Sequence, residues 1–302
     1  MGIETEESLV SVVVPAHQAM DVLDRCLQAL MLQSVAEDSY EVIVVDNGEN
    51  EGIEALVANY PRARCIQEST PGSYVSRNAG IASARGQVLA FTDADCVPDR
   101  KWIEEGLKLL RESEMVGVVG GRIELELPDV DDSELNAAQI YEKCMAFNQK
   151  NYVETKRFAA TANMLTTRRV IDVAGRFDER LYSGGDLEFG NRVADAGFEL
   201  RYADAAVVRH RSRSTLQELM RKARRLAGGE IKLAQLGIRR LSFKDRLNMF
   251  IPPFVSSWRL LKHDASGSSL RFRLVAIGTL NLLFMVKLAE SLAIWFGKEP
   301  AR

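Results

Sequence analysis

The chain has 302 residues, of which 46% are hydrophobic and 27% are charged, as is usual for a folded protein with a sizeable core. Its four cysteines (Cys26, Cys65, Cys96 and Cys144) lie far apart without a C-x-x-C pair, which argues against a zinc knuckle or a disulfide framework. The N-terminal stretch MGIETEESLV lacks the basic and apolar parts of a signal peptide. We therefore expect a cytoplasmic protein.

The net charge of −3 hides an uneven distribution along the chain. Residues 201–302 carry 20 Lys and Arg against 7 Asp and Glu, whereas residues 1–200 carry 19 against 35. This segregation indicates an acidic catalytic half and a basic part that meets anions, although a merely solvated basic face is the alternative. No basic motif interleaved with aromatic residues and no finger spacing indicates a nucleic-acid partner.

The first hundred residues alternate between strand and helix patterns. Apolar, β-branched runs predict buried strands at 9–15 and at 41–50, the second ending in a polar turn, and further strands at 63–68 and 87–95. Apolar residues at helical spacing predict helices at 21–31, 51–61 and 73–86, the last ended by Gly86. This alternation predicts an α/β fold with a mostly parallel sheet and helices on both faces. Ligands then bind beyond the carboxyl ends of the strands, where the polar residues 46–47 and 93–95 fall.

The pattern continues to about residue 212. We expect helices at 99–113, 137–151, 168–174 and 187–198, a loop at 151–160, and strands at 116–127, 159–168 and, as a pair, 199–211. From there the composition changes to a basic helix at 214–237 and an apolar segment with two prolines at 248–258. We expect two domains, 1–212 and 213–302.

The apolar segment 271–298 needs a separate interpretation. A spanning helix requires about 20 predominantly apolar residues. Here Lys287 ends the apolar run, and Glu290 follows at a spacing that allows the two charges to pair across one helical turn. We therefore favour a helix lying in a membrane interface over a spanning helix or a helix packed on the domain. The basic residues nearby suit anionic lipid headgroups: Arg259, Lys262, Arg271 and Arg273.

The stretch VLAFTDADCVPD, residues 88–99, places two carboxylates one residue apart after an apolar run. In an extended segment residues i and i+2 point the same way, so Asp93 and Asp95 converge on one spot. Mg²⁺ or Mn²⁺ relieves such repulsion and commonly bridges carboxylates to a diphosphate. By itself the pair also fits an ordinary polar turn that ends a strand.

Four segments, in this order, resemble the family-2 glycosyltransferases, which have the GT-A nucleotide-sugar-binding fold. They are VSVVVPAHQ, EVIVVDNGEN, SRNAGIASARGQVLAFTDADC and GRFDERLYSGGDLEFGNRVADAGFELRYADAAVVRH. Each motif alone is loose, but the order and spacing of all four are specific. The resemblance covers roughly residues 8–212 and implies a GT-A domain. From the basic and apolar composition of the remaining residues we expect a C-terminal helical extension that associates with a membrane.

The resemblance implies a nucleotide site at the strand ends. Pro15, Ala16 and His17 are expected to line the nucleotide, and Asp46 is expected to contact its base. Arg77 is expected near the uridine and the diphosphate. Asp93 is expected to face the ribose or nucleotide.

The resemblance also implies a metal site and a catalytic base. Asp95 is expected to bind Mg²⁺ or Mn²⁺ and the diphosphate, with His210 completing the metal site; a merely satisfied or exposed histidine is the alternative for His210. Asp186 is expected to take the proton of the acceptor hydroxyl as its oxygen attacks the anomeric carbon. It also fits the N-cap of the following helix. Glu188 is the rival base or an acceptor contact, and Arg192 is expected to tie that helix to the preceding loop.

Two departures from the family pattern bear on activity. The acidic motif is usually Glu-Asp, but here Gly185 precedes Asp186, which removes a carboxylate that would help to hold the loop or acceptor. The basic helix reads LMRKARRLA and lacks the tryptophan of the Q-x-x-R-W element of processive members. Its cationic residues form a solvated face by default, with Arg224 and Arg225 as candidate phosphate or acceptor contacts: Arg221, Lys222, Arg224 and Arg225.

The sequence thus predicts an inverting, metal-dependent glycosyltransferase that uses a nucleotide-diphosphate sugar, with a UDP-sugar as the expected donor. The expected acceptor is a lipid-linked saccharide, polysaccharide or glycolipid at the cytoplasmic face of a membrane. A non-catalytic nucleotide-sugar or lipid-binding protein on the same scaffold is the first alternative. A nucleotidyltransferase would need a glycine-rich basic loop after the first strand, and PAHQAMD provides neither feature.

Overall fold

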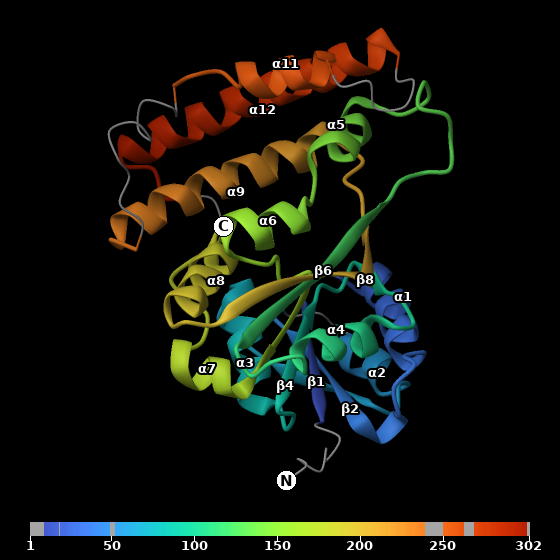
Figure 1. The fold of residues 1–302 in the computed structure, drawn as a ribbon. Coiled ribbons are helices and arrows are strands. Elements are labelled where there is room, and N and C mark those ends of the chain that lie inside the picture. Colours follow the sequence, from blue (N-terminus) through green and yellow to red (C-terminus); the bar gives the residue numbers. More distant parts are fainter. Residues whose placement is uncertain (1–8, 18, 49–51, 239–249, 263–268, 301–302) are drawn as a thin grey trace. The chain divides into compact units, whose positions relative to one another are not determined.

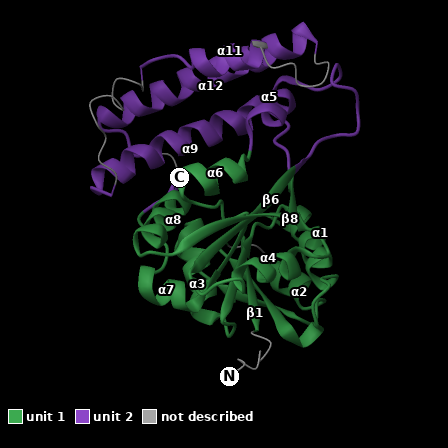
Figure 2. Ribbon diagram, in the orientation of Figure 1, with its two compact units in different colours: residues 1–124, 147–180, 185–210 green, residues 125–146, 181–184, 211–302 purple. Residues whose placement is uncertain are grey.

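A computed structural model of the chain is shown in Figure 1, and it describes residues 9–17, 19–48, 52–238, 250–262 and 269–300. Residues 1–8 of the acidic N-terminal stretch, the first residue of the helix expected at 51–61 and the first two of the apolar segment at 248–258 lie outside the described residues. The chain forms two compact units, coloured in Figure 2. Unit 1 contains residues 1–124, 147–180 and 185–210, and unit 2 contains residues 125–146, 181–184 and 211–302. Two earlier segments therefore join the C-terminal part in unit 2.

Unit 1 is organised by an eight-stranded sheet in the order β3-β2-β1-β4-β7-β6-β8-β5. The strands are β1 (Val10–Ala16), β2 (Tyr40–Asp46), β3 (Ala63–Gln67), β4 (Val88–Thr92), β5 (Cys96–Pro98), β6 (Val116–Glu126), β7 (Asn163–Thr167) and β8 (Glu199–Arg211). The pairs among β1, β2, β3 and β4 are parallel. The pairs β4–β7, β6–β7 and β5–β8 are antiparallel. The expected α/β class is confirmed, and the sheet is mixed because its later strands run antiparallel.

Helices cover both faces of this sheet (Figure 1). The helices of unit 1 are α1 (Met20–Met31), α2 (Ile53–Val57), α3 (Ser73–Ser83), α4 (Trp102–Leu110), α6 (Gln149–Lys156), α7 (Arg168–Ala174) and α8 (Gly185–Asp195), with a 3-10 turn at Glu37–Ser39. On β1, Val12 and Val14 join the core that contains Leu23 of α1. Val13 faces the other side, where a Cβ at Gly80 of α3 would lie 2.3 Å from Val13 Cγ1. Side chains that alternate along β1 therefore pack against a helix on each face of the sheet.

Gly86 does not end the helix before it, as the sequence led us to expect. Helix α3 ends at Ser83, and Ala84 already has an extended backbone. A Cβ at Gly86 would lie 2.4 Å from the carbonyl oxygen of Leu9, so this glycine is needed for a close approach to the chain entering β1.

The single helix expected at 137–151 was wrong, and so was the loop expected at 151–160. Helix α5 (Ala137–Met145) ends in unit 2, and α6 begins afresh at Gln149 in unit 1. Phe147 has a positive φ of 41°, which breaks the helical path. The side chain of Asn148 then accepts a hydrogen bond from the Asn151 N–H and caps α6.

Residues 199–211 form one long strand, β8, rather than the expected pair of strands. Its antiparallel partner at the sheet edge is the short strand β5, which the sequence did not predict. In this pairing Cys96 lies opposite His210. The pairing therefore carries the segment after Asp95 to the end of β8.

Unit 2 is helical. Its helices, within the described residues, are α5, α9 (Leu216–Gln235), α11 (Phe254–Lys262) and α12 (Leu270–Trp295). Helix α12 packs against α5, α9 and α11. One cluster joins Phe272 of α12 to Ile140 of α5, and a second joins Leu283 of α12 to Leu219 of α9. The capping box of Thr215 and Glu218 starts α9.

Helix α12 is, within the described part of the chain, the one helix long and apolar enough to cross a membrane by length and composition. The expected ion pair within this helix was wrong, because both charges have other partners. Lys287 Nζ lies 3.8 Å from Glu230 of α9. Lys298 Nζ donates hydrogen bonds to both carboxylate oxygens of Glu290, at 2.8 and 2.7 Å.

Buried Glu41 ties β1 and β2 to the segment that follows α3. Its carboxylate accepts hydrogen bonds from Ser11 Oγ (2.7 Å) and from the Arg85 backbone N–H (2.8 Å). The guanidinium groups of Arg85 and Arg64 lie at 3.1 and 3.3 Å. Burial alone would raise the pKa of Glu41, but these hydrogen bonds and charges outweigh it and hold that pKa below its ordinary value.

We expect Glu41→Gln to lower the free energy of unfolding at pH 7 by about 1–3 kcal/mol, because charge-assisted hydrogen bonds are lost in a buried site. A lowered folded-state pKa stabilises the fold above the ordinary Glu pKa, and that stability is lost as the pH falls through the lowered value. The difference in the free energy of unfolding between wild type and variant should therefore become smaller at acidic pH. Urea unfolding at several pH values measures it. Glu114→Gln, at an exposed ion pair with Arg169, is the control and should change little; a gap independent of pH would contradict the prediction.

Candidate active site

The residues expected to line a nucleotide meet at the carboxyl ends of β1 and β2. Ala16 pairs with Asp46 in the parallel register, and Pro15 precedes it on β1. The Asn47 N–H donates to the Ala16 carbonyl (2.9 Å), and His17 Nδ1 lies 2.8 Å from the Asn47 carbonyl oxygen. His17 is exposed. All four expected residues therefore lie at one edge of the sheet.

Asp46 is buried, with an exposed fraction of 1%. Its carboxylate accepts hydrogen bonds from the Gly48 N–H (3.2 Å) and from Gln67 Nε2 (3.0 Å). Next to it, the Asn47 side chain accepts the Gly72 N–H at 2.8 Å. These contacts fix the turn after β2 and join it to the start of α3.

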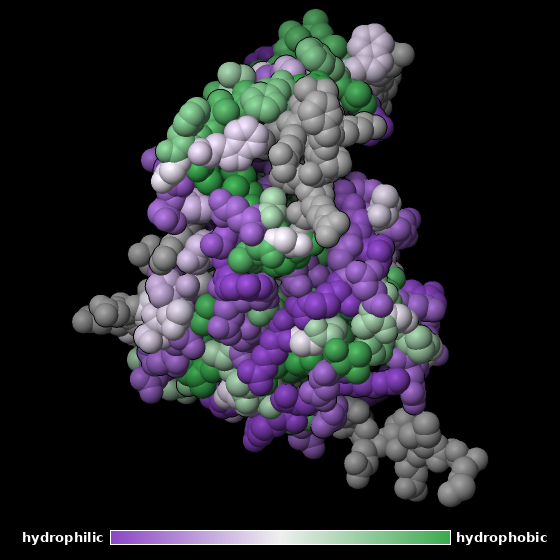
Figure 3. All heavy atoms as spheres, turned by 90° about the vertical axis from the view of Figure 1, so that its left-hand side faces the viewer, coloured by the Kyte–Doolittle hydropathy of each residue, from purple (hydrophilic) through white to green (hydrophobic). Residues whose placement is uncertain are grey.

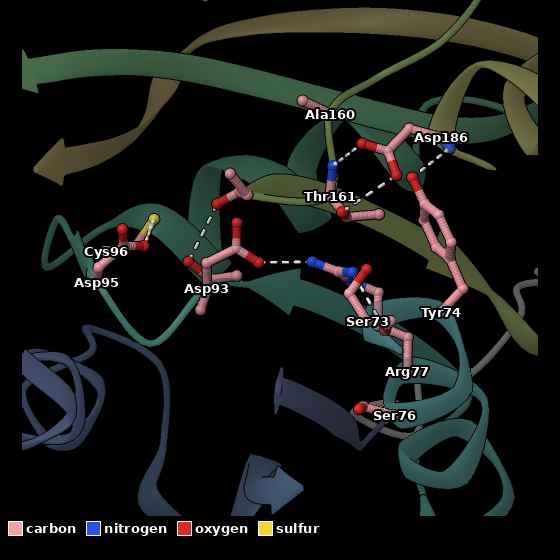
Figure 4. Close-up of polar contacts among 12 residues, drawn as sticks. Ser73, Tyr74, Ser76, Arg77, Asp93, Asp95, Cys96, Ala160, Thr161 and Asp186 are labelled. Carbon is pink, nitrogen blue, oxygen red and sulfur yellow. Dashed lines mark hydrogen bonds and ion pairs between the residues drawn. The ribbon is translucent and has the colours of Figure 1, made fainter. Parts of the chain in front are cut away.

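Arg77 of α3 reaches the end of β4. Its Nη2 lies 2.5 Å from Asp93 Oδ1, and its Nη1 donates to the Ser73 carbonyl at 3.2 Å (Figure 4). The side chain is buried, and its Nε has no hydrogen-bond partner within the described part of the chain. A buried guanidinium N–H without a partner is unusual, and a phosphate or hydroxyl oxygen would satisfy it.

Asp93, Asp95, Cys96 and His210 form a cluster that suits a divalent cation. One ligand atom of each lies within 4.8 Å of the others. His210 Nε2 is 3.7 Å from Asp95 Oδ1, and the ring of Phe147 lies 4.7 Å from the imidazole. Two carboxylates and an imidazole are ligands that Mg²⁺ and Mn²⁺ accept. The structure therefore brings together the two residues expected to bind metal.

Cys96 was not expected in this cluster. Burial raises the pKa of its thiol well above the ordinary value, and the negative charges of Asp93 and Asp95 raise it further. Magnesium and manganese prefer oxygen and imidazole ligands, so Asp93, Asp95 and His210 suit such an ion better than the thiol does.

Asp186 lies in the first turn of α8. Its carboxylate accepts hydrogen bonds from the backbone N–H (3.2 Å) and the hydroxyl (3.3 Å) of Thr161, which lies just before β7. The backbone N–H groups of Gly185 and Asp186 both donate to Tyr74 Oη, at 2.9 and 3.3 Å (Figure 4). The carboxylate thus contacts the neighbouring loop instead of capping its own helix.

The pKa of Asp186 is raised above its ordinary value. Burial is the main cause. The positive charge of Arg77, the Thr161 N–H and a hydrogen bond with Tyr74 act in the opposite direction, whereas the charge of Asp93 raises the pKa further. A carboxylate with a raised pKa is a stronger base and suits proton transfer near neutral pH.

Glu188, the rival base, is engaged elsewhere. Its carboxylate forms a two-point pair with Arg192, at 2.7 and 2.8 Å. Arg192 also donates hydrogen bonds to the carbonyl oxygens of Ala174 and Arg176. Arg192 therefore ties α8 to the segment before it, as the sequence led us to expect, and Glu188 holds Arg192 in place.

Arg224 and Arg225 lie on α9 of unit 2. Arg224 is exposed, and Arg225 Nη1 donates to the Tyr182 carbonyl at 3.4 Å. Their contact with phosphate or acceptor stays a prediction. On the same helix, Lys222 Nζ lies 3.5 Å from buried Glu142, and burial lowers the pKa of Lys222 to about 8.

Sequence reasoning missed Tyr74 and Thr161, which hold Asp186. Tyr74 lies three residues before Arg77, a spacing that places both on one face of α3, so helical periodicity offered a signal. Thr161 offered none, because its contact with Asp186 spans 25 residues of irregular chain and helix.

The chain is similar to several glycosyltransferases. Glycosyltransferase AglE of Haloferax volcanii is 32% identical over 232 residues, which are 75% of this chain and 74% of that protein. A pre-mycofactocin glycosyltransferase of Mycobacterium tuberculosis is 28% identical over 227 residues, or 71% of this chain and 45% of that protein. A chondroitin synthase of Escherichia coli is 25% identical over 235 residues, or 66% and 34%. The match thus spans less than half the length of the last two relatives.

A solved structure shares the fold. It is the mannosyltransferase PcManGT from Pyrobaculum calidifontis in complex with GDP-Man and Mn²⁺, which matches with a TM-score of 0.66 and 16% identity over 97% of this chain and 89% of that chain. At this identity the likeness shows the GT-A fold alone. The model of glycosyl transferase family 2 matches residues 11–173, more than half of the chain. With the Haloferax relative, this match shows that the chain belongs to glycosyltransferase family 2.

Proposed function

We propose that the protein is an inverting, metal-dependent glycosyltransferase that moves a sugar from a nucleoside diphosphate sugar to a lipid-linked saccharide, polysaccharide or glycolipid. One observation carries this proposal. A donor set for a divalent cation, a buried arginine with an unsatisfied N–H and a carboxylate with a raised pKa lie close together in unit 1. Inverting sugar transfer needs a stabilised leaving group and a base, and these groups can supply both.

Asp95 and His210, with Asp93 beside them, would hold Mg²⁺ or Mn²⁺. The bound cation would stabilise the charge that develops on the departing nucleoside diphosphate. Arg77, held by Asp93, would direct its free Nε N–H at a diphosphate or ribose oxygen. The base of the nucleotide would lie over the ends of β1 and β2, beside Pro15, Ala16, His17 and Asp46.

The donor nucleotide has two candidates. The family resemblance favours a UDP-sugar, whereas the structural neighbour from Pyrobaculum holds GDP-Man. A thermal-shift screen of UDP- and GDP-sugars with Mn²⁺ separates them, because a ligand that binds the folded state raises its melting temperature.

Asp186 would take the proton from the acceptor hydroxyl during the attack on the anomeric carbon. Thr161 holds the carboxylate through its N–H and hydroxyl, so the base keeps a defined orientation. The proton ends on the carboxylate oxygen, and the new bond forms on the face of the sugar opposite to the leaving diphosphate.

We expect Asp95→Ala to reduce sugar transfer about 100-fold or more, because the electrostatic stabilisation of the leaving diphosphate is lost. Chelation should abolish the wild-type activity, and added Mn²⁺ should restore it. Release of nucleoside diphosphate from the donor measures both effects. Asp99→Ala, at an exposed aspartate four residues away, is the matched control. Wild-type turnover by Asp95→Ala, or activity that survives chelation, would overturn the metal role.

We expect Asp186→Asn to keep donor binding and to lose transfer by about 10²–10⁴-fold, because the amide cannot accept the proton. In the wild type, activity should fall as the pH drops through the raised pKa of Asp186, which places the acid limb of the pH–rate profile above the range of an ordinary aspartate. Asp195→Asn, on the same helix but in an exposed pair with Arg157, is the control. Normal turnover by Asp186→Asn would refute its role as base.

We also propose that unit 2 binds the cytoplasmic face of a membrane. Of eighteen exposed large hydrophobic side chains among the described residues, twelve lie between residues 250 and 296. Figure 3 shows hydrophobic side chains gathered over the helices of this unit. Only 22% of the most apolar window of α12 is buried. This apolar surface with aromatic side chains suits a membrane interface.

An interfacial position fits unit 2 better than a spanning one. Helix α12 packs along α9, whose Glu230 pairs with Lys287, and α9 also carries basic residues, among them Arg221 and Arg224. Moving α12 to the centre of a bilayer would bring these charges with it or leave Lys287 unpaired in hydrocarbon. In an interfacial position these charges stay in contact with water, while the apolar surface of α11 and α12 lies in lipid.

We expect the wild type to sediment with vesicles that contain anionic lipid. The double variant Phe254→Asp/Trp258→Asp should bind about tenfold less or weaker still, because two of the most exposed apolar side chains of α11 are replaced by charges that anionic headgroups repel. Val173→Asp, at an equally exposed apolar residue of α7 in unit 1, is the matched control and should bind as the wild type does. Equal binding by the double variant would contradict this proposal.

A further inference from the structure

We infer that Tyr74 is the positioning residue for Asp186, and that Tyr74 and Gly185 form a matched pair in which the tyrosine ring requires glycine at position 185. The inference rests on the proposed role of Asp186 as the base. It concerns a residue of α3 that contacts the start of α8 in unit 1.

The hydroxyl of Tyr74 caps α8 from another helix. The first N–H groups of a helix have no partners within it and need an acceptor. The Gly185 N–H donates to Tyr74 Oη at 2.9 Å, and the Asp186 N–H donates to the same oxygen at 3.3 Å. One phenolic oxygen therefore fixes the backbone on which the base is carried (Figure 4).

The ring of Tyr74 is held in place and cannot easily move aside. It is 5% exposed and stacks on Phe177, with ring centroids 5.7 Å apart. Phe177 in turn exchanges two backbone hydrogen bonds with the side chain of Asn78, at 2.9 and 3.1 Å. The Arg77 guanidinium lies 5.8 Å from the Tyr74 ring centroid. The ring is thus packed between the base and the arginine expected at the diphosphate.

Position 185 has no room for a side chain while this ring is present. A Cβ at Gly185 would lie 2.6 Å from two atoms of the Tyr74 ring. A glutamate, which the family pattern led us to expect there, would displace the ring and withdraw its hydroxyl from both N–H groups. The absence of a glutamate at position 185 therefore goes together with the presence of Tyr74, whose hydroxyl supports the start of α8 through its hydrogen bonds with the backbone N–H groups.

The phenol also bears on the proton affinity of the base. A hydrogen bond with Tyr74 and the charge of Arg77 stabilise the charged form of Asp186, whereas Asp93 opposes it. These are the titratable groups that act on the carboxylate from α3 and from the end of β4. Removing the hydroxyl leaves the carboxylate with less support and two helix N–H groups without an acceptor.

The first experiment is Tyr74→Phe, which keeps the ring and removes the hydroxyl. We expect kcat to fall with little change in the KM for the donor, and the acid limb of the pH–rate profile to move to higher pH by about 0.5–1 unit, the effect of one lost hydrogen bond. Tyr40→Phe is the matched control, because buried Tyr40 also donates a hydrogen bond, to the Leu30 carbonyl, away from the site. A Tyr74→Phe profile that superimposes on the wild type would overturn the positioning role.

The second experiment tests the pair without any activity. Gly185→Ala should lower the melting temperature of the wild type by several degrees, because the new methyl group meets the ring. In a Tyr74→Ala background the same change should lower it far less, since the ring is absent. Additive losses would overturn the pairing. A wild type that transfers no sugar from any nucleotide sugar would overturn the proposed function alone. The melting temperatures of the wild type, the two single variants and the double variant would still test whether Tyr74 and Gly185 are coupled.

Discussion

The ion pair between Arg77 and Asp93 connects the parts of the candidate active site. Its arginine is buried, so the attraction acts in a medium where charges are weakly screened. Asp93 belongs to the cluster that would hold a cation, and the charge of Arg77 also opposes the rise in the pKa of Asp186. One guanidinium thus influences both the donor side and the base. An unpaired charge would be costly here, so the arginine and the aspartate depend on each other.

The sheet supplies the geometry around this pair through contacts that are distant in the sequence. Parallel β1, β2 and β4 bring their carboxyl ends to one edge, which collects the expected nucleotide residues and Asp93. The residues expected to bind a metal ion are brought together in another way, by the antiparallel pairing of β5 with β8, which sets Cys96 opposite His210. Three residues of β5 are enough, because the register of a strand pair fixes which side chains meet.

The sequence predicted what local patterns determine. Buried strands and amphipathic helices follow from periodicity, and the two aspartates at the end of β4 follow from the spacing of residues in an extended chain. It did not predict β5, whose three residues carry no periodic signal, or the break at Phe147, where φ is 41°. Thr161 was missed because only the folded chain brings it to Asp186, whereas Tyr74 lies on the same face of α3 as Arg77 and could have been found from helical periodicity. Helical spacing also allowed Lys287 to pair with Glu290, whereas in the folded chain Lys287 pairs with Glu230 and Glu290 pairs with Lys298.

Gly185 changes its meaning in the folded chain. In the sequence it stands where the family pattern has a glutamate beside the candidate base, and it favours the alternative of a non-catalytic binding protein. In the fold it is the residue that lets a buried phenol reach the first turn of α8. In unit 1 the capped turn, the carboxylate held by Thr161 and an arginine whose Nε has no partner among the described residues lie in one region. The glycine is therefore better explained as part of the support of Asp186 than as a sign of its decay.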